Sequence, residues 1–477
     1  MTASPFAAAA ARVAEEQAAE WLERTPASRA LARRAERSLA AGVTSAWQAW
    51  SPGTVWLERG SGSRVWDVDG NEYLDLHGGF GATIAGHGHP AVTEAIRRQA
   101  SRGTHFAQPS PDAVTVAEEL ARRFGLPRWR FTSSGTEATL DAVHLMRAAT
   151  RRPLVIKVEG HYHGHHDALS FSVDPSASEM GPAGAPHVVP ATGGLSAGAG
   201  HELRVVPFDD LDAVAGVLDA HRGQIAGMIL EPIAMNPVPI APRPGYLAGL
   251  RTLLTAHDAL LAFDEVQTGL TVDPGGATAL YGVVPDVVCV AKALGGGFPV
   301  AAVGGTREVM RLIETGAYKQ VGTLNGNPLA MAVVRAILEQ VLTPAGHAAI
   351  ASISSALAAG ARTHLAAAPV PGTARSLGAK GCVLFDDVWP TDHRSVLGLA
   401  FPVARGHWLY QLNHGVLTAP SGKWLATAAH GPEDVALYLR NLRGYLAAIA
   451  GRDAPSSSAT ASRNAVSASS KSSGVSR

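Results

Sequence analysis

Short runs of apolar residues alternate with longer amphipathic stretches through the middle of the chain. The apolar runs lie at residues 154–158, 227–231, 260–263 and 287–290. Strands that are apolar along nearly their whole length and are separated by helices indicate a mostly parallel sheet covered on both faces. The pattern therefore predicts an α/β fold whose large domain is built on such a sheet.

The N-terminal part of the chain shows a different pattern. Residues from about 10 to 40 are rich in Ala, Leu, Arg and Glu, which predicts a helix. Residues 55–58 and 63–68 alternate between apolar and polar, and Asp69-Gly70 precedes a further short run at 73–76. This spacing predicts strands, the last two of which are joined by a hairpin turn.

Beyond about residue 335 the pattern predicts a helix, short strands and a closing helix, which together suggest a smaller α+β domain. The strands are expected at 382–385 and 415–418, and the closing helix at about 432–450. From Arg452 the chain is mostly Ser, Ala and Thr, which predicts a disordered tail. The sequence thus predicts four parts. They are an N-terminal helix with small-domain strands (1–75), a large domain (76–335), a C-terminal small domain (336–451) and the tail (452–477).

The composition narrows the classes of function. A chain of 477 residues with 46% hydrophobic content can bury a large core. Basic and acidic residues number 40 each, so the charge indicates neither nucleic acid nor an anionic membrane as a partner. The two cysteines, Cys289 and Cys382, suit a reducing cytoplasm. No apolar run reaches the roughly 18 residues of a membrane-spanning helix, and early acidic residues argue against a signal peptide. We therefore expect a cytoplasmic protein.

Lys292 carries the strongest chemical signal in the chain. It ends the apolar run that begins at Val287 and is followed by the glycines at 295–297. A lysine at the mouth of a buried strand is partly desolvated, which lowers its pKa and frees the amine to form a Schiff base with an aldehyde. Asp264 ends another apolar strand. An amine and a carboxylate at two strand ends suit pyridoxal phosphate, which needs an imine partner and an anion for its pyridine nitrogen.

Further segments could contact the same cofactor. Ser134, Gly135 and Thr136 begin an expected helix, where backbone N–H groups and hydroxyls could bind a phosphate, although such a segment alone is usually an ordinary helix cap. Tyr162 and His163, in a histidine-rich stretch, could stack on a flat ring. A metal site and plain surface histidines are the alternatives, but no His-x-x-x-His pattern or cysteine partner supports a metal.

Three polar residues in turns are weaker candidates. Asn236 and Gln267 follow strands and could hydrogen bond to a ring oxygen of the cofactor. Thr323 lies in a Gly- and Asn-rich turn before a helix. Taken singly, each is more simply a turn or cap residue.

Taken together, these segments resemble a class III aminotransferase, most of all the glutamate-1-semialdehyde aminomutase group. The likeness runs from about residue 39 to 446. It is carried by Ser-Gly-Thr-Glu-Ala (134–138), Tyr-His-Gly (162–164), Asp-Glu-Val-Gln-Thr-Gly (264–269), the lysine with Gly-Gly-Gly (295–297), and Gly-Thr-Leu-Asn-Gly-Asn-Pro (322–328). The resemblance implies the fold-type I architecture of pyridoxal phosphate enzymes and a homodimer.

The resemblance also implies a role for each matching residue. Lys292 would form the internal aldimine, and Asp264 would pair with the pyridinium nitrogen. Ser134, Gly135 and Thr136 would bind the phosphate of the cofactor. Tyr162 would contact the face of its ring. Asn236 and Gln267 would contact its phenolate side. Thr323 would reach the phosphate of the neighbouring subunit's cofactor.

The substrate side departs from the aminomutases. Their arginine that grips a substrate carboxylate is replaced by Gln48, in a segment that includes Ser45 and Trp47. A neutral amide cannot replace a bidentate guanidinium. A glutamate of the C-terminal motif becomes Trp424, and Phe80 is a further candidate wall. Each of these aromatic residues could equally belong to a core or a dimer interface.

We therefore expect an aminotransferase that moves an amino group between an amine or amino-acid donor and a carbonyl acceptor. An aminomutase uses the same chemistry within one molecule and is the main alternative. A decarboxylase or epimerase on the same fold is a weaker one, and a non-catalytic binding protein is the weakest.

Overall fold

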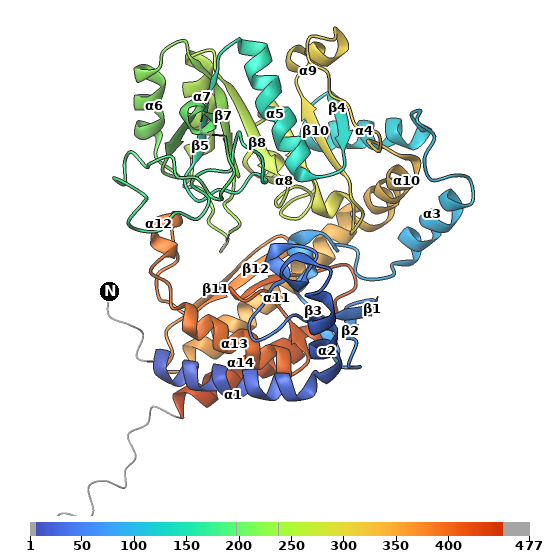
Figure 1. The fold of residues 1–477 in the computed structure, drawn as a ribbon, viewed down its shortest axis with the longest axis vertical. Coiled ribbons are helices and arrows are strands. Elements are labelled where there is room, and N and C mark those ends of the chain that lie inside the picture. The colour runs from blue at the N-terminus through green and yellow to red at the C-terminus, as the bar shows by residue number, and fades with distance from the viewer. Residues whose placement is uncertain (1–5, 197, 237, 452–477) are drawn as a thin grey trace, which may run out of the picture.

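The computed structural model describes residues 6–196, 198–236 and 238–451. The predicted tail, 452–477, lies outside the described residues. The chain forms two lobes, a large one built on a central sheet and a smaller one that contains both ends of the described chain (Figure 1). Within the described residues no single helix is long and apolar enough to cross a membrane. One bent pair, Pro328–Val341 with Pro344–Ala366, passes that test only when the two are taken together.

The large lobe contains a seven-stranded sheet. Its order is β4-β10-β9-β8-β7-β5-β6, and only β10 runs antiparallel to its neighbours. The prediction of a mostly parallel sheet is confirmed. The strands are β4 (Arg128–Thr132), β5 (Leu154–Val158), β6 (Leu203–Val206), β7 (Ile225–Leu230), β8 (Leu260–Glu265), β9 (Val287–Val290) and β10 (Ala301–Gly305).

Helices cover both faces of this sheet because its strands are apolar on both sides. In β5, Val155 packs in one core cluster with Val143 and Met146, whereas Ile156 packs in a second cluster on the other face. The helices of this lobe are α3 (Pro90–Ala100), α4 (Pro111–Phe124), α5 (Gly135–Thr150), α6 (Leu211–Ala220), α7 (Tyr246–Ala256), α8 (Gly276–Tyr281), α9 (Arg307–Glu314) and α10 (Pro328–Ala336).

The smaller lobe combines two small sheets with helices from both ends of the chain. One sheet has the order β1-β2-β3-β13 and the other the order β11-β12-β14. The strands are β1 (Leu57–Ser61), β2 (Arg64–Asp67), β3 (Glu72–Asp75), β11 (Thr373–Leu377), β12 (Lys380–Leu384), β13 (Val416–Leu417) and β14 (Lys423–Leu425). The helices are α1 (Ala7–Arg24), α2 (Pro26–Ala35), α11 (Pro344–Ala366), α12 (His393–Val396), α13 (Phe401–Asn413) and α14 (Pro432–Ala450).

Single helical turns connect several of these elements. The 3₁₀ turns are Ala40–Gly42, Ala46–Gln48, Gly78–Gly81, Ala199–Glu202 and Lys292–Leu294, and Ile337–Val341 is a π-helical turn.

Three details differ from or refine the expected pattern at the N-terminus. The single helix expected at about 10–40 is two helices, because Thr25 adopts a non-helical conformation and Pro26 begins α2. The first strand begins only at Leu57, and all five of its residues are exposed. The hairpin expected at Asp69-Gly70 is present, since β2 pairs antiparallel with β3.

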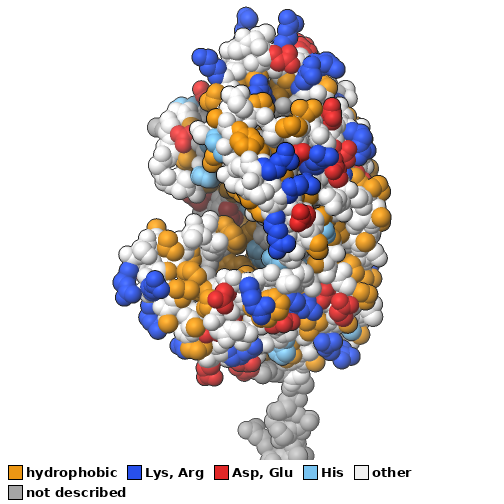
Figure 2. All heavy atoms as spheres, turned by 90° about the vertical axis from the view of Figure 1, so that its right-hand side faces the viewer, with side chains coloured by type: hydrophobic (Ala, Val, Ile, Leu, Met, Phe, Trp, Pro, Cys, Tyr) orange, Lys and Arg blue, Asp and Glu red, His pale blue; other side chains and the backbone are white. Residues whose placement is uncertain are grey.

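The N-terminal strands join the C-terminal part of the chain rather than the large lobe. Leu74 of β3 lies opposite Val416 of β13 in a parallel pairing. The division at residues 75, 335 and 451 stays a prediction. On one side the molecule has a deep hollow where the large upper lobe meets the smaller lower lobe (Figure 2).

Candidate active site

A cavity of about 270 Å³ opens at the carboxyl ends of the parallel strands in the large lobe. Ligands of open α/β sheets bind at this edge because loops and helix N-termini converge there. The structure brings together eight of the residues that the sequence singled out. They are Ser134, Gly135, Thr136, Tyr162, His163, Asp264, Gln267 and Lys292.

Lys292 follows β9 and begins a short 3₁₀ turn at the wall of the cavity. Its backbone is in the left-handed region, with a φ of 49°, which is uncommon for a residue that carries a side chain. Such conformations concentrate at functional sites. Burial lowers the pKa of the amine, and the carboxylates of Asp264 and Glu231 act in the opposite direction. The lysine is therefore closer to its neutral, nucleophilic form than an exposed lysine would be.

Asp264 is buried at the end of β8, and its two oxygens are both engaged. Oδ2 lies 2.7 Å from Nδ1 of His163, and Oδ1 accepts a hydrogen bond of 3.0 Å from the backbone N–H of Val266. Burial raises the pKa of Asp264 to about 6, against the lowering effects of that backbone hydrogen bond and of Lys292. The carboxylate is thus held in one orientation and is ionised at neutral pH.

His163 holds Asp264, a role that differs from the expected stacking on the ring. Burial lowers the pKa of His163 well below its usual range, so the imidazole is neutral and its Nδ1–H donates to Asp264. Its Nε2 is buried and has no hydrogen-bond partner among the described residues. Within the described residues, no group of three or more His, Cys, Asp or Glu side chains could hold a metal ion.

The N-terminus of α5 lines the cavity. Ser134 is the N-cap, and its Oγ accepts from the N–H of Glu137 at 3.3 Å. Within the described part of the chain, the N–H groups of Gly135 and Thr136 donate to no protein acceptor, and they lie at the positive end of a helix of 16 residues. An anion is the group that this end of the helix stabilises.

Two glycines make room for a ligand at this end of the cavity. A Cβ on Gly135 would lie 3.0 Å from the side chain of Val266. A Cβ on Gly164 would lie 2.7 Å from Oγ1 of Thr136, and the φ of 93° at Gly164 also favours glycine. Larger residues at these two positions would force Val266 or Thr136 to move.

Glu231 was overlooked in the sequence, although it ends an apolar strand just as Asp264 does. It lines the cavity and is buried, and burial raises its pKa to about 7. Its oxygens accept from the N–H groups of Tyr162 at 3.1 Å and Met235 at 3.2 Å. Glu231 therefore fixes the loop that carries Tyr162, a residue that is 43% exposed and lines the cavity.

Three of the candidates for cofactor contacts, Asn236, Gln267 and Thr323, stay predictions. Asn236 lies outside the cavity, because its Oδ1 accepts a hydrogen bond of 3.1 Å from Nζ of Lys423. Gln267 lines the cavity, but its Oε1 accepts from Nζ of Lys380 at 3.3 Å. Thr323 lies in an exposed turn that lines a different cavity.

Trp424, a candidate wall of the substrate pocket or a core aromatic, lies in the core of the smaller lobe. The side chain is 3% exposed, and its Nε1 donates to Oγ of Ser354 at 3.0 Å. It fills this position because Gly381 lies directly opposite on β12, where any Cβ would overlap the indole.

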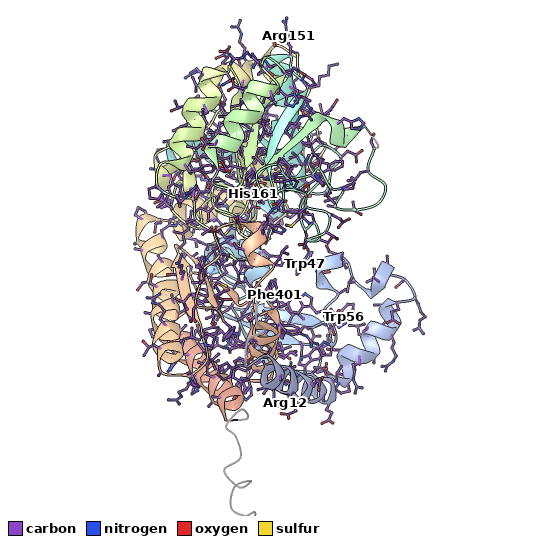
Figure 3. All side chains as sticks on the ribbon, turned by 90° about the vertical axis from the view of Figure 1, so that its left-hand side faces the viewer. Arg12, Trp47, Trp56, Arg151, His161 and Phe401 are labelled. Atoms are coloured by element: carbon purple, nitrogen blue, oxygen red, sulfur yellow. The ribbon has the colours of Figure 1, made fainter. Side chains whose placement is uncertain are left out.

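The other substrate candidates lie beside the cofactor cavity rather than in it. Gln48 folds back on its own turn, where its Oε1 accepts from Oγ1 of Thr44 at 2.6 Å and from the N–H of Ser45 at 3.0 Å. Trp47 contacts Phe80 edge-on, with ring centroids 5.2 Å apart. Trp47 and Gln48 line a second cavity of about 320 Å³. Figure 3 places Trp47 at the level where the lobes meet, below His161 of the large lobe.

The Aminotransferase class-III family model matches residues 47–427, and the chain therefore belongs to the class III aminotransferases. The match spans both lobes and includes every segment that lines the 270 Å³ cavity.

Individual relatives agree with this family. Glutamate-1-semialdehyde 2,1-aminomutase 2 from Brevibacillus brevis is 36% identical over 385 residues, which cover 80% of this chain and 88% of that protein. The crystal structure of an omega-transaminase from Sphaerobacter thermophilus has a TM-score of 0.85 and 31% identity, and the match covers 90% of this chain and 99% of that chain. The crystal structure of a glutamate-1-semialdehyde aminomutase from Pseudomonas aeruginosa PAO1 in complex with PMP has a TM-score of 0.85 and 30% identity. That match covers 93% of this chain and 99% of that chain.

These similarities confirm the predicted fold-type I architecture and identify the chain as an enzyme that uses pyridoxal phosphate. The residues of the cavity fit that cofactor. They provide a buried lysine amine, a buried carboxylate held by a histidine, and a helix N-terminus with two N–H groups for a phosphate.

Cofactor affinity is expected to rise with pH between about 5 and 7, because the carboxyl of Asp264 ionises in this window. Below its pKa of about 6 the carboxyl is neutral and cannot stabilise a protonated pyridine nitrogen. Above it the carboxylate can, so binding should tighten by up to about tenfold per pH unit. Equilibrium dialysis of pyridoxal phosphate against wild type and Asp264→Asn isolates this contribution, because the variant lacks the titrating group. Identical pH profiles for the two proteins would contradict it.

Proposed function

We propose that this chain is an aminotransferase that moves an amino group from an amine or amino-acid donor to a carbonyl acceptor, with Lys292 as its catalytic base. The observation that carries the proposal is the position of Lys292 in one cavity with Asp264 and the N-terminus of α5. The amine of Lys292, the carboxylate of Asp264 and a helix N-terminus suited to a phosphate thus line the same cavity.

The residues that would hold the cofactor follow from the cavity. The phosphate would be bound by the N–H groups of Gly135 and Thr136 and the hydroxyls of Ser134 and Thr136. Tyr162 and Val266 would contact the ring, since both line the cavity. Asp264, held by His163, would face the pyridine nitrogen.

Pyridoxal phosphate supplies, when bound, an aldehyde that condenses with amines and a ring that accepts the electron pair of a broken C–H bond. Lys292 would hold the aldehyde until a donor amine displaces it. Its lowered pKa would then let it take the proton from the donor carbon and return it at the cofactor's aldehyde carbon. Asp264 would keep the pyridine nitrogen protonated throughout.

Transfer between two substrates is preferred here over transfer within one. In the aminomutase group an arginine is expected at position 48 to bind the substrate carboxylate. Here Gln48 is neutral and hydrogen bonded within its own turn, so any substrate carboxylate must be bound by other residues. The similarity to the glutamate-1-semialdehyde 2,1-aminomutase from Brevibacillus brevis supports the aminomutase as the second candidate. Both reactions would use the same Lys292 and Asp264.

A labelled donor distinguishes the two. Holoenzyme is incubated with a carbonyl acceptor and a donor whose nitrogen is isotopically labelled, and the products are read by mass spectrometry. Label in the acceptor would support the aminotransferase. Turnover of 4,5-diaminovalerate or its isomers without label exchange would support the aminomutase instead.

We further propose that the enzyme works as a homodimer in which Thr323 completes the neighbouring site. Thr323 is exposed and stands beside two exposed apolar side chains, Val321 at 83% and Leu324 at 56%. Apolar side chains so exposed in one turn suit a surface that another subunit covers.

Leu324→Asp is expected to shift the protein from dimer to monomer and to weaken binding of pyridoxal phosphate, because a buried unpaired charge opposes association. Sedimentation velocity and cofactor titration measure the two effects. Val284→Asp is the matched control, since Val284 is 47% exposed and precedes the end of β9 that lies away from Lys292. A Leu324→Asp protein that stays dimeric would remove this turn from the interface.

A cytoplasmic location is also proposed. Cys289 and Cys382 are both free and buried, and burial raises the pKa of the Cys382 thiol to about 12. Such thiols are inert packing groups, which is compatible with a reducing compartment.

A further inference from the structure

Two lysines of the smaller lobe lie against the active site without a carboxylate partner. Lys380 begins β12 and Lys423 begins β14, and these strands pair with each other. In Figure 1, β12 lies on the side of the smaller lobe that faces the large lobe. No carboxylate of the described residues forms a salt bridge with either lysine, although Lys380 is only 6% exposed.

Both ammonium groups are held by neutral oxygens, and one of these acceptors, Gln267, lines the cofactor cavity. Nζ of Lys380 donates to the carbonyl of Phe80 at 3.2 Å and to Oε1 of Gln267 at 3.3 Å. Nζ of Lys423 donates to the carbonyl of Met235 at 2.9 Å and to Oδ1 of Asn236 at 3.1 Å. Gln267 itself lines the cavity, so only one side chain separates Lys380 from the cofactor site.

A third buried lysine shows what a purely structural arrangement looks like in this protein. Nζ of Lys157, in β5, donates to three backbone carbonyls, those of His161, Phe171 and Ser172. An ammonium group has three N–H donors, so Lys157 is fully satisfied. Lys380 and Lys423 each use two donors, and each retains one for a further acceptor.

Holding two ammonium groups here without a counter-ion carries an energetic cost. Removing a cation from water without a counter-ion is unfavourable unless hydrogen bonds and an opposite charge compensate. Burial lowers the pKa of Lys423 to about 8 and that of Lys380 well below its usual range, and Lys292 adds to both effects. An incoming anion would supply the missing compensation for both groups.

We propose that Lys380 and Lys423 form the subsite that binds a carboxylate group of the substrate, with Gln267 yielding its hydrogen bond to the incoming anion. The substrates are then amino acids and oxo acids rather than simple amines and ketones. This assignment rests on the proposed aminotransferase function. The two lysines, which are distant in sequence, would then supply the positive charge that is absent at Gln48.

Phe80 and Trp47 give the subsite an apolar neighbour. Nζ of Lys423 lies 5.5 Å from the centroid of the Phe80 ring, and Phe80 in turn contacts Trp47. When the lysines bind the carboxylate of a substrate, the carbon chain of that substrate would therefore lie against aromatic side chains. Substrates with an aliphatic or aromatic chain between amino group and carboxylate fit this arrangement.

The test compares a dicarboxylate with its neutral amide on the holoenzyme. Glutarate carries no amine or ketone, so it binds without reacting, and glutaramide has the same shape without charge. Calorimetry should show that Lys380→Met and Lys423→Met each weaken glutarate binding tenfold or more and leave the weak binding of glutaramide within twofold. Arg222→Met is the control, since it removes a surface cation whose side chain is 75% exposed. Equal glutarate affinity in wild type and both lysine variants would overturn the proposal.

Two further readouts separate a binding role from a structural one. The ratio of half-reaction rates for 4-aminobutyrate and butylamine should fall at least tenfold in either lysine variant, because only the first donor has a carboxylate. Thermal unfolding of both variants should occur at the same or a higher temperature than wild type, since an unpaired buried charge is lost. An unchanged rate ratio would count against the subsite. If no donor converts the wild-type cofactor, the aminotransferase proposal fails, while the glutarate titration still decides the subsite.

Discussion

Replacing Lys292 with alanine is expected to abolish turnover while the protein remains folded. The substitution removes both the amine that holds the cofactor aldehyde and the base that moves the proton. General acid–base catalysis alone contributes up to roughly 10⁴-fold, so the rate with any donor should fall by at least about that factor. The bound cofactor should also lose the visible absorbance that depends on the lysine.

The fold is expected to tolerate this change. Within the described residues Nζ of Lys292 makes no hydrogen bond, and its charge is buried at a cost that alanine does not carry. Circular dichroism and sedimentation should therefore match wild type. Lys319→Ala serves as the control for loss of an exposed lysine and should retain full activity. Undiminished turnover by the Lys292→Ala enzyme would refute the assigned base.

Asp264→Asn is expected to keep the cofactor bound but to slow proton abstraction by about 10²- to 10⁴-fold, the range for loss of one preorganised electrostatic group. Asparagine has the same shape and can still accept from the N–H of Val266. It carries no charge, however, so the pyridine nitrogen loses its proton and the ring accepts electrons less well.

The rate of cofactor conversion with donors that carry hydrogen or deuterium on the reacting carbon measures this effect. A larger isotope effect in the Asp264→Asn enzyme would show that proton abstraction has become limiting. Asp286→Asn is the matched control. That carboxylate pairs with Arg251 at 2.6 Å at the opposite end of β9, so its loss should affect stability and not the isotope effect. A near-normal rate for Asp264→Asn would remove Asp264 from the mechanism.

The sequence predicted the centre of the site because parallel strands place their carboxyl ends at one edge. Lys292 and Asp264 end neighbouring strands, and Asp264 lies opposite Cys289 in the pairing of β8 with β9. The proximity of two chemically active residues that end apolar strands can therefore be predicted even when the loop structures are unknown. Glu231 could have been found by the same argument, since it follows β7.

The substrate side could not be predicted in this way, because its contacts join distant parts of the chain. Lys380 and Gln267 are 113 residues apart in the sequence, and no local pattern predicts their hydrogen bond. The position of Trp424 depends on the residue opposite it in the sheet. That residue is a glycine, which leaves space for the indole in the core. The motif resemblance puts Gln48 at the position of an arginine, but the structure shows its amide hydrogen bonded within its own turn.

The central claim is that Lys292 runs a transamination half-reaction in this cavity. Its most direct test is the visible absorption spectrum of purified holoenzyme during titration with single donors, including α-, β- and ω-amino acids, simple amines and 4,5-diaminovalerate. We expect carboxylated donors to bleach the band of the bound cofactor to that of pyridoxamine phosphate, in proportion to the number of active sites. A band that persists with every donor except the diamine, or no band at all, would contradict it.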